Sequence, residues 1–117
     1  MPASLPDSVI LLGAAIKYLE DELLPALSGY HRFKTRVTIN VLSTVRRELE
    51  LRESQAAAEL QRLAALIGYG GTLDELNAEL AMRIRSGAIA ADDPQLVAHV
   101  RESLRAALEI NNPGWLK

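Results

Sequence analysis

Apolar residues recur every three or four positions along most of the chain, and no stretch alternates apolar and polar residues with period two. The first spacing is typical of helices that bury one face, whereas period-two alternation would indicate strands. With its short connections, the pattern predicts an all-α bundle in one domain over residues 1–117. We expect the ends, about 1–4 and 113–117, to be disordered or loosely packed.

Signals that start and stop helices divide the chain into about five helices, the second of which is long and central. Capping residues mark the starts, and Pro25, three glycines at 68–71, Gly87 and an Asn-Asn-Pro triplet mark the ends. The expected helices are Pro6–Leu24 with Ser4 and Asp7 as a capping box, Tyr30–Glu53, a third from Ser54 to the glycines, a fourth from the capping box Thr72–Glu75 to Gly87, and a fifth from Asp93 and Pro94 to Asn111.

The apolar positions define a face on each of the longer helices. The central helix is apolar over so wide an arc that it requires contact with at least two other helices. The faces are Val9, Leu12, Ile16, Leu19 and Leu23 on the first helix, Phe33, Val37, Val41 and Val45 beside Ile39, Leu42 and Leu49 on the second, and Val97, Val100, Leu104 and Leu108 on the fifth.

Composition narrows the function classes. Apolar residues make up 49% and aromatic residues only 4% of the chain, so the core must be aliphatic. A net charge of −2 argues against a dedicated nucleic-acid binder, which needs a basic face. Without cysteine, disulfide scaffolds, thiol catalysis and zinc ribbons are excluded. No stretch predicts a signal peptide or a membrane span, and we expect a cytoplasmic protein.

A polar stripe runs along the central helix. Arg32, Arg36 and Asn40 follow one another at four-residue steps, with Arg47 and Glu48 further along. Because guanidinium groups bind carboxylates and phosphates, the stripe could hold an anionic ligand or a partner's acidic side chain.

The alternative interpretation of the stripe is structural, and it is the one favoured here. The first helix carries an acidic cluster of Glu20, Asp21 and Glu22, which could pair with Arg36 while Asn40 forms hydrogen bonds inside the bundle. Buried polar groups are usually satisfied internally in this way.

Other chemistry has little support in the sequence. The two histidines, His31 and His99, lie on different elements, and His99 with Glu102 reads as an exposed helix face rather than a metal site. Neither a nucleophile elbow nor a phosphate-binding loop is present. We therefore expect no catalytic residues, no metal and no cofactor.

The chain ends in Asn-Asn-Pro-Gly-Trp-Leu-Lys, which carries its single tryptophan. Trp115 and Leu116 could fold back to cover the core, which is the favoured interpretation. Otherwise they are an exposed anchor for a partner, since tryptophan is enriched at binding hot spots.

Several stretches resemble a bacterial family of unknown function over about Asp7 to Pro113. They are YLEDELLPAL, RFKTRVTINVLSTVRRELEL, LNAELAMRIRSG and the closing Asn-Pro. The resemblance implies a single small helical domain, often encoded beside aminoglycoside-phosphotransferase-like kinases and acyl-CoA dehydrogenases. It also implies that members keep the equivalents of Arg32, Arg36, Asn40 and Glu48, and it transfers no catalytic residue.

The leading functional hypothesis is a non-catalytic helical interaction module, an accessory to such a kinase or dehydrogenase and a possible homo-oligomer. The wide apolar arcs leave hydrophobic surface for association. The second hypothesis is a small-ligand-binding bundle that holds an anionic molecule at Arg32, Arg36 and Asn40. The third, an enzyme using that pocket, lacks a base next to a nucleophile. We expect neither nucleic acid nor membrane as a partner.

Overall fold

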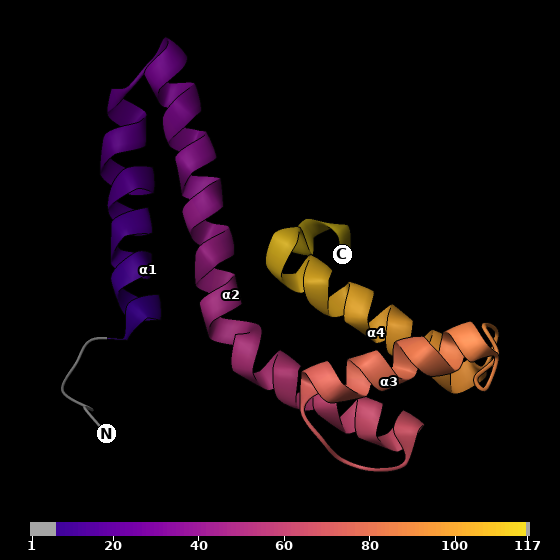
Figure 1. Cartoon of the computed structure of the whole chain (residues 1–117). Helices are drawn as coiled ribbons and strands as arrows, with labels where there is room; N and C mark the ends of the chain where they lie inside the picture. Colours follow the sequence, from indigo (N-terminus) through magenta and orange to yellow (C-terminus); the bar gives the residue numbers. More distant parts are fainter. Residues whose placement is uncertain (1–6, 117) are drawn as a thin grey trace. The chain divides into compact units, whose positions relative to one another are not determined.

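The computed structural model describes residues 7–116, and this part of the chain contains four α-helices and no strand. The all-α prediction is confirmed, and the predicted number of five helices is wrong by one. The helices are α1 Ser8–Tyr18, α2 Gly29–Ile67, α3 Leu73–Ser86 and α4 Pro94–Asn111 (Figure 1).

Helix α2 accounts for the difference, because it continues through the predicted break at Ser54 for a total of 39 residues. The residues on either side of Ser54 are good helix formers, and neither glycine nor proline interrupts them, so a single serine does not end the helix. The helix ends where the glycines predicted it. Gly68 adopts a left-handed φ of 97°, and its N–H donates to the carbonyl of Ala64 at 2.8 Å.

The chain divides into two compact units, Met1–Leu51 and Arg52–Lys117. In the first unit, α1 and the beginning of α2 lie side by side as an antiparallel hairpin (Figure 1). Ile16 of α1 and Ile39 of α2 are its buried apolar side chains. The apolar face predicted on the first helix is confirmed, since all of its members are buried or half-buried.

The end of the first helix differs from the prediction that Pro25 stops it from outside. Helix α1 continues as a π-helical turn, Leu19–Leu23, and then as a 3₁₀ turn, Leu24–Ala26, which contains the proline. The N–H of Leu24 bonds to the carbonyl of Leu19, five residues back. Proline has no N–H to donate, and the start of a short helical turn tolerates it for that reason.

The N-terminal cap of α1 is Asp7, whose Oδ1 accepts the N–H of Val9 at 2.9 Å. The other half of the predicted capping box, Ser4, and the predicted loose segment 1–4 lie outside the described residues. A carboxylate in this position satisfies a free N–H of the first turn and interacts favourably with the helix dipole.

The second unit has an aliphatic core. Leucine and isoleucine side chains meet from the end of α2 and from α3 and α4, and half-buried Leu60, Ala64, Leu73 and Ile89 pack around them. Its buried members are Leu63, Ile67, Leu76, Leu80 and Leu96.

Local capping signals place α3 and α4 as predicted. The Thr72 hydroxyl accepts the N–H of Glu75 at 3.1 Å, and the Glu75 carboxylate accepts the N–H of Thr72 at 2.9 Å. Gly87, with a φ of 81°, ends α3. Asp93 caps α4 through the N–H groups of Gln95 and Leu96.

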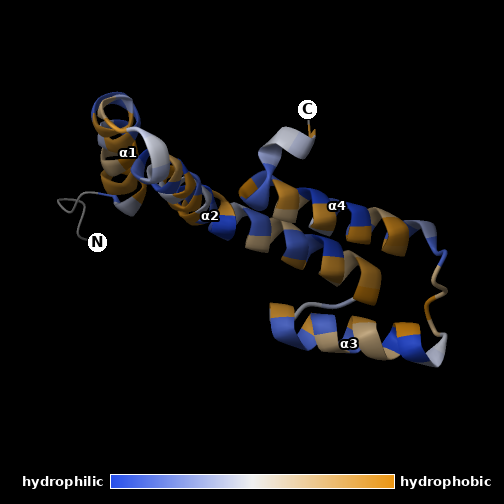
Figure 2. Cartoon of the chain, turned by 90° about the horizontal axis from the view of Figure 1, so that it is seen from above, coloured by the Kyte–Doolittle hydropathy of each residue, from blue (hydrophilic) through white to orange (hydrophobic). Residues whose placement is uncertain are grey.

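The orientation of α4 about its axis was not anticipated. Its buried residues are Leu96 and His99, whereas Val97, Val100 and Leu104 of the predicted apolar face are exposed, Leu104 at 63%. Figure 2 shows hydrophobic and hydrophilic segments alternating along this helix. On the inward side of α4, Leu96 joins the aliphatic core, and Gln55 Nε2 of α2 donates to the carbonyl of Ala106 at 2.9 Å.

Candidate functional site

The polar stripe of α2 begins with a structural residue. Arg32 is half-buried, and its Nη1 donates to the carbonyl of Leu24 at 2.8 Å. That carbonyl belongs to the 3₁₀ turn between the two helices, where regular helical hydrogen bonding has ended. Arg32 therefore ties the start of α2 to the end of the preceding turn.

The middle of the stripe faces solvent. Arg36 and Asn40 are exposed, and within residues 7–116 the side chain of Arg36 forms neither a hydrogen bond nor an ion pair. The expected ion pair between Arg36 and the acidic cluster of the first helix is thus absent from the described residues. Asp21 of that cluster instead lies 3.6 Å from Lys17, one turn earlier.

The far end of the stripe is engaged locally. Arg47 Nη2 donates to the hydroxyl of Thr44 at 3.2 Å, and Glu48, although exposed, also has an interaction partner. The structure thus brings the stripe residues together along one helix without enclosing them. Anion binding by Arg32, Arg36 and Asn40 stays a prediction.

Apolar residues accompany the stripe, one turn apart. Arg36 follows Phe33 by three positions and Asn40 follows Val37 by three, so each polar residue neighbours an exposed apolar one. An apolar strip with a polar edge is the usual composition of a protein–protein interface.

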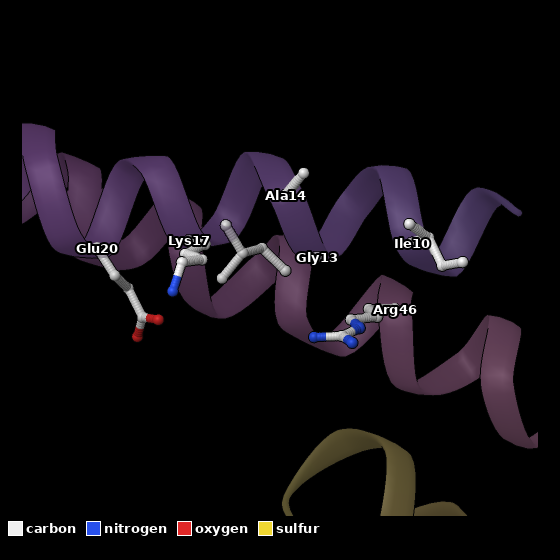
Figure 3. A pocket seen from close by; sticks show the side chains of 7 residues that line it. Ile10, Gly13, Ala14, Lys17, Glu20 and Arg46 are labelled. Carbon is white, nitrogen blue, oxygen red and sulfur yellow. The ribbon is translucent and has the colours of Figure 1, made fainter. Parts of the chain in front are cut away.

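Arg46 lines a groove in the first unit that the sequence did not reveal. The groove has a volume of about 500 Å³, and Lys17 of α1, Glu20 of the π-helical turn and Arg46 of α2 line it (Figure 3). The Arg46 guanidinium packs on the backbone of α1 at Gly13. Its buried Nε has no hydrogen-bond partner and lies 3.8 Å from the Glu50 carboxylate. The signal for this groove in the sequence was Gly13, a glycine inside an apolar helix.

Gly13→Ala is expected to stabilise the protein by about 0.5 kcal/mol. A Cβ at this position would meet the Arg46 guanidinium at 3.1–3.3 Å, but that group ends a flexible side chain and can move. Alanine then gains helix propensity over glycine. Urea unfolding followed by circular dichroism measures the change.

The matched control is Gly29→Ala, where φ is +62° and no other atom lies within 4 Å of the position that an alanine Cβ would occupy. Alanine is strained in the left-handed region, so this variant should lose about 1 kcal/mol. A destabilised Gly13→Ala would mean that the guanidinium cannot leave its position.

A polar cluster joins α2 and α4 in the second unit. Arg62 Nε donates to Nδ1 of His99 at 3.2 Å, and Arg62 Nη2 lies 3.4 Å from the Ser103 hydroxyl. The imidazole is buried, and burial together with the Arg62 charge lowers the pKa of His99, although Glu59 acts in the opposite sense. His99 is therefore neutral and accepts a hydrogen bond.

This arrangement corrects the interpretation of His99 as part of an exposed helix face. Spacing could have found it, because Leu96, His99, Ser103 and Ala106 recur at three and four residues along α4. A depression of about 200 Å³ beside the cluster is lined by Arg62, Leu66 and Gln95 among others. Because Arg62 donates to Nδ1, that nitrogen is not free to act as a base toward Ser103.

Trp115 and Leu116 belong to a 3₁₀ turn, Pro113–Leu116, that follows α4. Trp115 is 76% exposed. The favoured expectation that the pair folds back onto the core is therefore wrong for the tryptophan. The short turn after Pro113 directs the side chain to solvent, as the alternative of an exposed anchor requires.

Residues 25–115 match the family described as Domain of unknown function (DUF6285). The chain belongs to this family. The resemblance noted from the sequence is confirmed to that extent. Neither a curated protein nor a solved structure matches the chain.

The DUF6285 match covers the helices that carry the features described above. It begins at Pro25, after α1 and the π-helical turn, and includes all of α2, α3 and α4. The stripe, the Arg62–His99 cluster and Trp115 lie inside the match, whereas Gly13 and Lys17 of the groove lie before it.

Two further observations concern the described part of this DUF6285 chain. Its histidine, aspartate and glutamate side chains form no group of three that could hold a metal ion. None of its helices is long and apolar enough to cross a membrane.

Proposed function

We propose that this DUF6285 protein is a non-catalytic helical interaction module, an accessory subunit of an enzyme in the bacterial cytoplasm. The observation that carries the proposal is the orientation of α4, which buries a partly polar face and exposes its more apolar one. Surface of this kind is unusual unless another molecule covers it.

The exposed face of α4 has the composition of a docking surface. Val97, Val100 and Leu104 follow one another at helical spacing, and all three are exposed. In the same unit Trp115 and Leu116 lie in the 3₁₀ turn that follows α4, and an exposed anchor was the second of the two interpretations drawn from the sequence. An amphipathic helix that presents such a row typically lies in a hydrophobic groove of its partner.

The partner proposed here is an aminoglycoside-phosphotransferase-like kinase or an acyl-CoA dehydrogenase. The support is the family resemblance, which implies that such enzymes are encoded beside members of the family. Within the second unit, Arg62 donates to the buried His99, and this contact between α2 and α4 lies on the side of α4 opposite the proposed docking face.

Co-expression of the full chain with each candidate enzyme, followed by native mass spectrometry, tests this function. We expect a stable complex with one of the two enzymes. Val100→Asp places a charge on the α4 face and should abolish the complex, and Trp115→Ala should weaken it at least tenfold, as expected of a hot-spot residue.

Leu11→Asp is the matched control for Val100→Asp, because it places the same charge at an exposed apolar side chain of α1 in the first unit. It should leave the enzyme complex intact. Elution of both enzymes free of the chain, or binding by Val100→Asp equal to that of the wild type, would contradict the proposal.

A further inference from the structure

The first unit carries an exposed apolar row that the proposed function does not use. Its members lie on α2 at four-residue steps, and Val41 at the centre is 57% exposed. Val41 lies two residues from the buried Ile39, which turns the helix by about 200°, so Val41 faces away from the hairpin interior. Each four-residue step turns the row by about a further 40°, so the row crosses this side of the helix obliquely. The row consists of Phe33, Val37, Val41, Val45 and Leu49.

The residue types in the row are arranged almost symmetrically about Val41. Valines stand four positions before and after it, and Phe33 and Leu49 stand eight positions away. Two copies of α2 that pack antiparallel about a two-fold axis at Val41 would thus place Val41 against Val41 and Val37 against Val45, with the larger apolar side chains at the edges of the contact. A surface that complements itself in this way is the requirement for a two-fold dimer.

Charges beside the row are complementary under the same operation. Lys34 and Glu48 lie seven positions on either side of Val41, which is about two helical turns, so both share its side of the helix. Antiparallel pairing would bring Lys34 of one copy opposite Glu48 of the second copy, twice in each dimer. Both side chains are exposed.

The wider charge distribution favours the antiparallel direction. From residue 23 to residue 47 the chain contains no acidic residue, and Arg32, Lys34 and Arg36 occupy the start of α2. The other end of the row carries both signs, with Arg46 and Arg47 beside Glu48 and Glu50. Parallel pairing would place the two basic ends together, which is unfavourable, whereas antiparallel pairing places each basic end against an end whose charges balance.

We infer that a second copy of this chain covers the α2 row, antiparallel and with its two-fold axis at Val41. Helix α2 then packs on two sides, against α1 of its own chain and against α2 of the second copy, as its wide apolar arc requires. This dimer surface is separate from the α4 face proposed for the enzyme.

Cysteine cross-linking tests the register, because the natural chain contains no cysteine. Val41→Cys should form a disulfide-linked dimer under mild oxidation, since a disulfide needs Cα atoms within about 7 Å. Val37→Cys alone and Val45→Cys alone should remain monomeric on non-reducing gels, whereas their mixture should cross-link. Leu104→Cys, on α4, is the control for random collision.

Two results of this experiment would overturn the inference. Cross-linking of Val41→Cys no faster than that of Leu104→Cys would mean that Val41 does not meet its copy. Efficient cross-linking of Val37→Cys alone would mean that the helices pair in parallel or with the two-fold axis at Val37 instead of Val41.

Charge exchange tests the ionic contacts independently. Lys34→Glu and Glu48→Lys should each weaken the dimer about tenfold in sedimentation equilibrium, because each change creates two like-charge contacts. The double variant restores both pairs and should return the dissociation constant to near the wild-type value. Circular dichroism checks that the helix content is unchanged. If a single variant loses helix content, the dissociation constant of the double variant decides whether the ionic contacts form.

The outcomes separate this inference from the proposed function. A monomeric wild-type chain that still binds its enzyme overturns only the dimer. A dimer that passes the cross-linking test but binds neither enzyme overturns only the accessory role.

Discussion

Replacing Leu63 by alanine is expected to lower the free energy of unfolding by about 2–5 kcal/mol. Leu63 lies on α2 at the centre of the second unit, has no exposed surface and packs among leucine and isoleucine side chains from three helices. Truncation removes buried apolar atoms and leaves a cavity that these neighbours fill only in part. For a chain of this size the loss is a large fraction of total stability.

Leu104→Ala is the matched control, since it makes the same change in the same unit at a side chain that is 63% exposed. Its effect should stay within about 0.5 kcal/mol. Both variants are measured by urea unfolding with circular dichroism at one protein concentration, because association would shift the midpoint. Equal effects of the two substitutions would contradict the described core.

Lowering the pH from about 7.5 to about 5.5 is expected to destabilise the protein through His99. Burial and the charge of Arg62 lower the pKa of His99 in the folded state below its ordinary value of about 6.5. Between the two pKa values the unfolded chain binds the proton and the folded chain does not. The contribution of the neutral His99 to the free energy of unfolding is therefore fully present above about pH 6.5, and it is lost as the pH falls toward the folded-state pKa.

The size of the pH effect has an upper limit of about 1.4 kcal/mol for each pH unit, and solvent near the cluster should keep it below that limit. His99→Asn retains an oxygen that can accept from Arg62 but cannot titrate in this range. The difference between wild type and His99→Asn in unfolding free energy should shrink or reverse as the pH falls. A difference independent of pH would show that His99 titrates as an exposed histidine.

The ends of α3 and α4 could be predicted from the sequence because their signals are local. Thr72 and Glu75 satisfy each other's N–H groups within one turn, and Gly87 adopts the left-handed conformation that a helix end favours. Ser54 is also a capping residue type, yet it lies inside α2. Without a glycine or proline nearby, the helix-forming residues around it continue the helix.

Contacts between helices could not be predicted from the sequence in the same way, because they do not depend on local signals. The pairing of Arg62 with His99 joins residues 37 positions apart, and it depends on the rotation of α4 about its axis. Hydropathy alone favours the Val97–Val100–Leu104 face as the inward one, whereas the hydrogen bonds from α2 lie on the other face. The stripe on α2 was visible in the sequence, but the engagement of Arg32 by a turn carbonyl was not.

The exposed position of Trp115 gives this protein an optical reporter of its own. The indole is the single one in the chain and is largely exposed to water, so we expect its fluorescence emission at the long wavelength of a solvated tryptophan. Transfer into an apolar environment moves that emission to shorter wavelength. Docking of the C-terminal turn on another molecule is therefore detectable without a label as a blue shift of the tryptophan emission, and the other fluorescent side chains of the chain are three tyrosines.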